Sequence, residues 1–167
     1  MRSLQLAASL LSLTAWAQPA LSPADRTFVT TAANEGLAAV ELGRLAMNLG
    51  LNKEVRDAGA RLVADHEKAN EALQKAVTPW SMVLPGKTDE AHQRQLDMLA
   101  QLMGSDFDST FSKHLLVGHQ RTVQLFRDQA KTGQVRALRA FAADTLPMLE
   151  RHLKFAKELA RGRSAAL

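Results

Sequence analysis

Residues 23–77 have the sequence PADRTFVTTAANEGLAAVELGRLAMNLGLNKEVRDAGARLVADHEKANEALQKAV. On both sides of Gly50 the apolar side chains recur at steps of three and four residues, the spacing of one buried face on an α-helix. These positions are Phe28, Ala32, Ala39, Leu42, Ala46 and Leu49 before the glycine, and Val55, Leu62, Ala69 and Leu73 after it. Only about two residues separate the two patterns, so the stretch predicts two long helices packed as antiparallel neighbours.

The ends of these two helices carry local signals. Ser22 followed by Pro23 is typical of a helix start, with a capping side chain before a proline in the first turn. Gly50 is expected to end the first helix and Asn52 to cap the second, which runs to about Val77.

A break follows, over residues 78–104. Pro79, Pro85 and Gly86 interrupt any helix at its start. A short polar helix is then expected from Thr88 to about Met103, with its apolar side formed by Leu96, Leu99 and Met103. This segment has too little apolar surface to fold alone, so we interpret it as a crossover within one domain.

Two more long helices are predicted on either side of Gly133, the first capped by Ser105 or Asp106 and the second running from about Gln134 to Ala160. Pro147 lies inside the last helix and is expected to bend it. The fold class is therefore all-α, a ferritin-like four-helix bundle over residues 23–162, with a long crossover carrying a short extra helix.

The first seventeen residues form a separate unit. Arg2 precedes a mostly apolar run, and Ala15-Trp16-Ala17 matches the small-x-small pattern that signal peptidase cleaves. We expect residues 1–17 to be a cleaved signal peptide, 18–22 a short extension and 163–167 a C-terminal tail. The mature protein is then expected in the periplasm or outside the cell.

Composition excludes several partners and ligands. The chain has no cysteine, which excludes disulfides and thiolate metal ligands together. Its net charge is +4, without a lysine and arginine cluster beside aromatic residues, so no nucleic-acid binding is predicted. No stretch after the signal peptide is long and apolar enough for a transmembrane helix. The bundle topology is compatible with a homodimer.

Ionisable residues on the buried faces indicate a metal site. His66, His119 and His152 lie one per long helix, and Glu35 lies in the apolar face of the remaining one. Glu35 and His66 are each about fifteen residues from the turn at Gly50, so at ~1.5 Å per residue they are expected at the same level.

In the second pair of helices the sequence does not decide which histidine of the first helix belongs to the site. His119 lies about fourteen residues and His152 about nineteen residues from Gly133, an offset of roughly 7 Å. His114 is level with His152, which makes it an alternative to His119. It ranks lower than the other three histidines.

The types of ligand narrow the choice of metal ion. Di-iron bundles use Glu-x-x-His pairs, and this chain has none. Imidazoles with one carboxylate fit a single ion such as Zn, Cu or Ni better than a di-iron centre. The alternative is a structural or stress-protective bundle whose buried histidines only pack, with Glu35 hydrogen-bonded to His66. No complete di-iron or hydrolase motif is present, so no enzymatic activity is predicted.

Four segments resemble one family. They are AANEGLAAVELGRLA (32–46), LVADHEKANEAL (62–73), FDSTFSKHLLVGHQRTVQLF (107–126) and FAADTLPMLERHL (141–153). In this order they resemble the exported bacterial domain-of-unknown-function family 4142, which implies a ferritin-like bundle in the cell envelope and no assigned activity.

The resemblance also singles out individual positions. It places His66, preceded by Asp65, His119 and His152 at the family's histidines, and Glu41 at an acidic position of the first motif. The chain departs from the pattern where Ala39 replaces an acidic residue and Gly118 replaces an aspartate. Glu35, one turn before Ala39, is a substitute for the missing carboxylate.

Overall fold

The structure, a computed structural model, describes residues 20–162 and is all-α over that range. Four long helices make up the bundle: α1 (Pro23–Leu49), α2 (Lys53–Val77), α4 (Gly104–Thr132) and α5 (Arg136–Ala160). A 3-10 turn (η1, Thr78–Trp80) and the short helix α3 (Glu90–Ala100) lie in the crossover. The predicted signal peptide and C-terminal tail lie outside the described residues.

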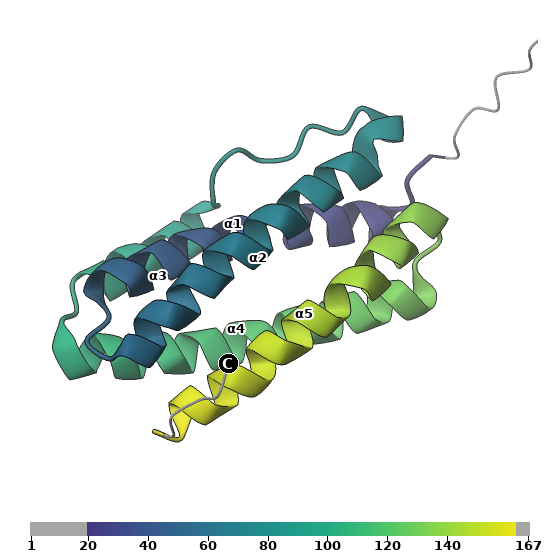
Figure 1. Cartoon of the computed structure of the whole chain (residues 1–167). Coiled ribbons are helices and arrows are strands. Elements are labelled where there is room, and N and C mark those ends of the chain that lie inside the picture. Colours follow the sequence, from purple (N-terminus) through teal and green to yellow (C-terminus); the bar gives the residue numbers. More distant parts are fainter. Residues whose placement is uncertain (1–19, 163–167) are drawn as a thin grey trace, which may run out of the picture.

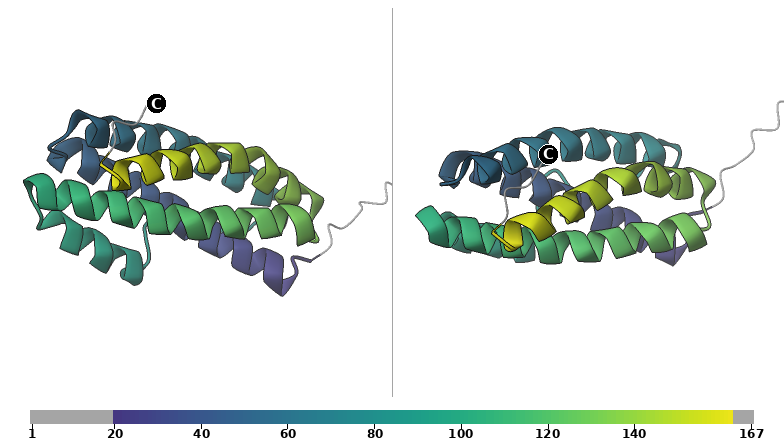
Figure 2. Two further views of the ribbon diagram at one scale, coloured as in Figure 1. Left: turned by 90° about the horizontal axis from the view of Figure 1, so that it is seen from below. Right: turned by 60° about the horizontal axis from the view of Figure 1, so that its bottom comes forward.

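The four long helices form two antiparallel hairpins, α1 with α2 and α4 with α5, and the hairpins pack face to face (Figures 1 and 2). The crossover runs back along the bundle, so α2 and α4 point in the same direction. This confirms the all-α class and the long crossover with its extra helix. No helix within residues 20–162 combines the length and apolar character that crossing a membrane needs.

Several helix ends lie where the sequence predicts them. Ser22 caps α1, because its hydroxyl accepts a hydrogen bond from the Asp25 backbone N–H at 3.0 Å. Gly50 and Gly133 follow the last residues of α1 and α4. Pro147 lies inside α5, as predicted.

Four of the predicted features at helix ends differ: the bounds of α3, the cap of α4, the start of α5 and the cap of α2. Asp89, not Thr88, caps α3, which ends at Ala100 and leaves Met103 81% exposed instead of on an apolar side. Helix α4 begins without a side-chain cap, so neither Ser105 nor Asp106 has that role. Helix α5 begins at Arg136, two residues later than expected.

The fourth difference is the cap of α2. The Asn52 side chain makes no capping bond there. Instead the buried carboxylate of Asp108, on α4, accepts hydrogen bonds from the backbone N–H groups of Leu51 and Asn52 at 3.0 and 2.9 Å. A capping group supplied by a distant helix satisfies the free donors at a helix start as well as a local one does.

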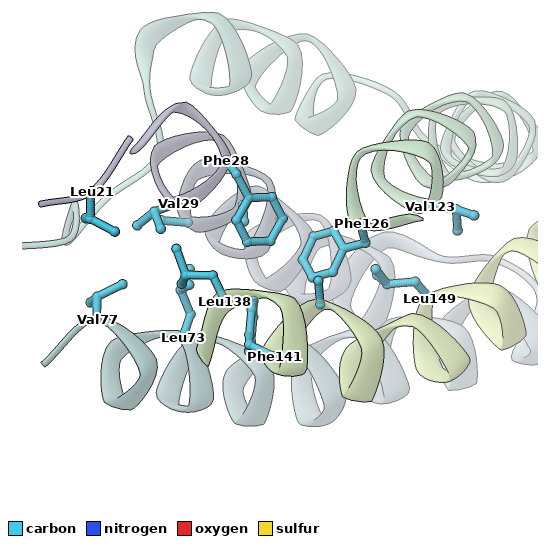
Figure 3. Packing of buried hydrophobic residues seen from close by; sticks show 13 residues of the cluster. Leu21, Phe28, Val29, Leu73, Val77, Val123, Phe126, Leu138, Phe141 and Leu149 are labelled. Atoms are coloured by element: carbon cyan, nitrogen blue, oxygen red, sulfur yellow. The ribbon is translucent and has the colours of Figure 1, made fainter. Parts of the chain in front are cut away.

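The apolar core is divided into two clusters. The first lies towards the α4–α5 turn and includes Phe28, Leu73, Phe126, Leu138 and Phe141 (Figure 3). The second lies towards the α1–α2 turn and includes Leu42, Leu62, Phe107, Phe111 and Leu115. On α2, α4 and α5 the residue that separates the clusters is a histidine, so the midpoint of the bundle is polar.

Candidate metal centre

Three histidines meet at the midpoint of the bundle. His66 comes from α2, His119 from α4 and His152 from α5, and all three are buried. Their ring centroids are 5.3 to 5.6 Å apart. One ring nitrogen from each lies within 4.8 Å of the other two. The sequence alone leaves the choice between His119 and His114 open, and the structure brings His119 together with His66 and His152.

The expected offset of roughly 7 Å in depth between His119 and His152 does not keep their side chains apart, because the ring centroids are 5.3 Å from each other. The two helices do not begin at the same distance from Gly133: α4 ends at Thr132, and α5 begins only at Arg136. Counted from those ends, the offset falls to about 4.5 Å at ~1.5 Å per residue. Side chains that point towards one another cover that distance.

Each of the three rings has a nitrogen without a partner. His66 Nε2, His119 Nε2 and His152 Nδ1 are buried and make no hydrogen bond. A buried polar atom without a partner is costly, so three of them in one place call for an explanation. A cation that these three nitrogens bind would explain them.

The opposite nitrogens of two rings are held in place. His152 Nε2 lies 2.9 Å from Asp65 Oδ2, and His119 Nδ1 lies 3.1 Å from the Leu115 carbonyl oxygen. Since a carboxylate and a carbonyl only accept hydrogen bonds, each ring donates its N–H outward. The remaining nitrogen of each ring then carries the lone pair, which is the arrangement that proteins use to orient metal-binding histidines.

The three imidazoles are held in their neutral, ligand-competent form. Burial lowers the pKa of His119 to about 3, with a further contribution from His152, although the hydrogen bond to Leu115 acts in the opposite direction. Burial and the other two histidines likewise hold the pKa of His66 well below 6.5. For His152, burial lowers the pKa and the bond to Asp65 partly offsets it.

Three of the four remaining candidates lie near this cluster. Asp65 is half-buried and acts on the cluster through His152. Glu35 is on the wall of a cavity that also contains His66 and His119, but its carboxylate pairs with His92 at 3.7 Å. His114 is half-buried on the same wall. Glu41 is exposed and bound to Arg44, away from the histidines.

His92 is the residue that sequence reasoning missed. It lies in the first turn of the short helix, where its backbone N–H donates to the Asp89 carboxylate. Its ring, however, is only 22% exposed and lies on the cavity wall beside Glu35. The Asp-x-x-His spacing of Asp89 and His92 was the available signal, since it also lets the carboxylate accept from the ring.

Two cavities reach the cluster. One of about 210 Å³ lies between α1, α2, α3 and α4, and its lining includes His66 and His119. The other, of about 240 Å³, lies between α2 and α5 and is lined by Asp65 and His152, with Arg61 and Arg151 among its other residues. The cluster is therefore buried but is reached from more than one side.

The fold and the cluster define an all-helical bundle with three histidines at its centre. The chain belongs to the family described as domain of unknown function 4142, whose model matches residues 11–159. A solved structure with a similar fold is a DUF305 fragment from Deinococcus radiodurans, at 13% identity and a TM-score of 0.72, covering 86% of this chain and 99% of that one. The comparison with curated proteins finds no significant match.

Proposed function

We propose that this chain is an exported bundle protein that binds one transition-metal ion between His66, His119 and His152. The observation that carries the proposal is that each of the three histidines has a buried ring nitrogen without a partner and offers a ligand atom within 4.8 Å of the other two. Tetrahedral sites with imidazole bonds of ~2.1 Å place the nitrogens ~3.4 Å apart. Small rotations of the three side chains bring the nitrogens to that spacing from at most 4.8 Å.

The ligand set selects the class of metal. Three neutral imidazoles favour Zn, Cu or Ni over Mg or Ca, which prefer oxygen ligands. Three protein ligands leave a fourth position for water or another small ligand, as in sites that are not purely structural. The carboxylate of Asp65, bonded to His152, supplies part of the negative charge that a buried cation needs.

Export is the second part of the proposal. Its support is the sequence of residues 1–17, with Arg2, an apolar run and Ala15-Trp16-Ala17. We expect the protein from a bacterial host to be found in the periplasmic fraction with Gln18 as its first residue. Mass spectrometry of that fraction tests this, and a full-length cytoplasmic product would contradict it.

Metal binding is tested on protein purified without a histidine tag and freed of metal with a chelator. Equilibrium dialysis against Zn²⁺, Cu²⁺ or Ni²⁺ is expected to give one tightly bound ion. His119→Ala is expected to weaken this binding by more than ~100-fold, since loss of a supporting partner alone costs 10–100-fold. His114→Ala, on the same helix but outside the cluster, is the control and is expected to keep the tight site.

The same experiment separates the alternative, a bundle whose histidines only pack. In that case none of the three metals binds tightly to the unmodified protein, and His66→Leu is neutral or stabilising, because apolar contacts replace a polar group. That pair of results would overturn the metal-binding proposal. Circular dichroism of each variant confirms that a loss of binding is not a loss of fold.

A further inference from the structure

The cavity that reaches His66 and His119 joins the buried cluster to a second group of ligand-type side chains. Its lining also includes Glu35 from α1, His92 from α3 and His114 from α4. The side chains of Glu35 and His92 are 27% and 22% exposed, whereas His66 and His119 are buried. The cavity therefore runs from a pair that solvent reaches to a cluster that it does not.

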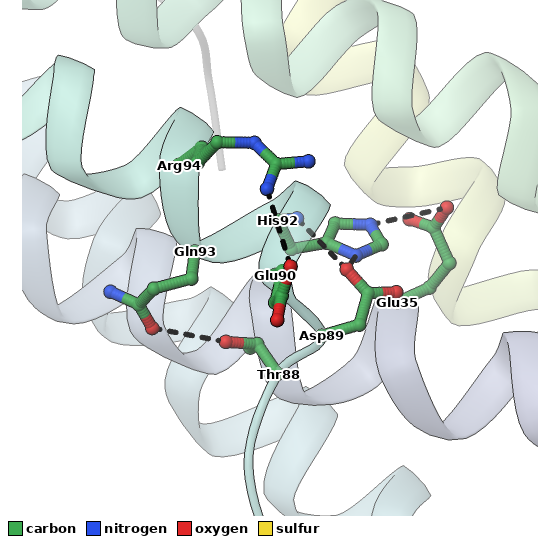
Figure 4. A network of polar contacts seen from close by, with 7 residues as sticks. All are labelled: Glu35, Thr88, Asp89, Glu90, His92, Gln93 and Arg94. Atoms are coloured by element: carbon green, nitrogen blue, oxygen red, sulfur yellow. Dashed lines mark hydrogen bonds and ion pairs between the residues drawn. The ribbon is translucent and has the colours of Figure 1, made fainter.

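The ring of His92 is held so that one nitrogen faces Glu35. His92 Nδ1 lies 2.9 Å from Asp89 Oδ1, and the same carboxylate oxygen accepts the His92 backbone N–H at 2.9 Å (Figure 4). The ring therefore donates from Nδ1 to Asp89, and in its neutral form Nε2 carries the lone pair. This repeats the carboxylate–imidazole arrangement that His152 makes with Asp65.

The gap between His92 Nε2 and Glu35 Oε1 is too long for a hydrogen bond and suits a cation. The two atoms are 3.7 Å apart and point towards one another (Figure 4). A divalent ion bound to both at ~2.0–2.2 Å in tetrahedral geometry separates its ligands by ~3.4 Å. One imidazole and one carboxylate are ligands that Zn, Cu and Ni accept.

We propose that Glu35 and His92 form an outer metal site, at which an ion is captured before it passes through the cavity to the three buried histidines. This inference rests on the proposed metal binding of the inner cluster. Two protein ligands with water completing the shell bind weakly, and three buried imidazoles bind tightly. The ion therefore moves inward, from the site of lower affinity to the site of higher affinity, and His114 lies on the cavity wall that it passes.

The position of α3 supports this role. The short helix lies in the crossover and packs on α1 and α4, so it is the element that brings His92 over Glu35. Leu96 and Leu99 anchor it in the second apolar cluster. The crossover thus completes the cavity wall with a ligand that the four long helices do not supply.

The first test measures the rate of loading. Metal-free protein is mixed with Cu²⁺ in a stopped-flow instrument, and the absorbance of the copper–imidazole centre is followed. His92→Gln and Glu35→Gln are each expected to slow loading by about 10-fold or more, within the range that supporting groups contribute. The equilibrium affinity of the inner site should change by less than about 3-fold. Gln95→Ala, which alters the same cavity wall without a strong ligand, is the control.

The second test isolates the outer site. In His119→Ala, with the inner cluster disabled, weak Cu²⁺ binding is expected, with the electron paramagnetic resonance signature of nitrogen coordination. Adding His92→Gln should remove it. Normal loading in both outer variants with no residual weak site would mean that Glu35 and His92 form only an ion pair, and would overturn the outer site alone. Failure of the unmodified protein to bind copper tightly would instead overturn the proposed function.

Discussion

Asp65 fixes the orientation of one of the three histidines, and this makes it the most informative single residue. Its carboxylate accepts the Nε2–H of His152 at 2.9 Å and so directs Nδ1 into the cluster. Without that acceptor the ring is free to turn and to exchange the two nitrogens. Asp65 therefore acts on the metal site without touching the ion.

Replacing the carboxylate tests this role. Asp65→Asn is expected to lower the affinity for Zn²⁺ by about 10- to 100-fold, because the amide is a weaker acceptor and His152 loses its fixed orientation. Competition titration against a chromogenic chelator measures the change. Asp57→Asn is the control, since Asp57 lies on the same helix and pairs with the exposed Lys53. Equal affinities in the two variants would contradict the role of Asp65.

The neutral histidines make the metal-free protein sensitive to acid. The folded pKa of His119 is about 3, against 6.5 for a free histidine, and that of His66 is also well below 6.5. The unfolded chain therefore binds more protons than the folded one below pH 6.5. Stability is fully present above that pH and is lost as the pH falls towards the folded pKa.

The expected loss is large enough to measure. Between pH 6.5 and 5.0 His119 should lower the free energy of unfolding by about 1.6 kcal/mol, and His66 should act in the same direction. Urea unfolding of chelator-treated protein at several pH values gives the profile. His119→Gln is expected to flatten it by one histidine's share. A profile that is level between pH 5 and 8 in the unmodified protein would show that the rings are not held neutral.

At the scale of the elements, the α1–α2 hairpin depends on a close approach of two backbones. A Cβ added at Gly59 would lie 2.5 Å from the Gly43 carbonyl oxygen and 2.9 Å from the Ala46 Cβ. The glycines thus set the distance between the helices, and with it the position from which α2 presents His66.

Gly59→Ala is accordingly expected to destabilise the protein by about 1–3 kcal/mol, because the helices must separate. Gly118→Ala is the matched control, since a Cβ there meets nothing within 4 Å. In the middle of α4 that change should instead stabilise by ~0.5–1 kcal/mol, because alanine loses less backbone entropy than glycine. Thermal unfolding of both variants measures the difference. A stable Gly59→Ala protein would mean that the hairpin is loosely packed.

How far the sequence predicts these elements depends on how local each signal is. Ser22 caps α1 with its own side chain, and Gly50 and Gly133 directly follow the last residues of α1 and α4, so these predicted helix ends are confirmed. The cap of α2 comes from Asp108, 56 residues after Asn52, and no local pattern contains it. The cluster lies between these cases: helical periodicity placed His66 on a buried face, but only the packing of α4 against α5 selects His119 over His114.

Glu35 shows the same limit from the other side. Its place in the apolar face of α1 predicts a buried carboxylate beside His66. Periodicity says which face of the helix a residue lies on, but it does not identify the residue's partner. The structure brings α3 against α1, so the carboxylate faces His92 instead. The partner comes from the crossover, the segment whose path the sequence pattern defines least.

At the scale of the whole molecule, the three histidines join three of the four long helices across a break in the apolar core. Each cluster of apolar side chains stabilises one end of the bundle. Between the two clusters lie three buried imidazole rings, each with a nitrogen that has no hydrogen-bond partner. An ion bound there would connect α2, α4 and α5 at the level where apolar packing is interrupted.

A bound ion is therefore expected to stabilise the entire bundle, because the unfolded chain cannot hold three imidazoles together. At an ion concentration 100 times the Kd the gain is about 2.7 kcal/mol. For a domain of this size that corresponds to a rise of roughly 8 °C in Tm. Differential scanning calorimetry with Zn²⁺ or Ni²⁺ measures it, and Mg²⁺, which prefers oxygen ligands, should give no shift. A rise of the same size in His119→Ala would assign the stabilisation to other residues, since that variant lacks the imidazole through which α4 holds the ion.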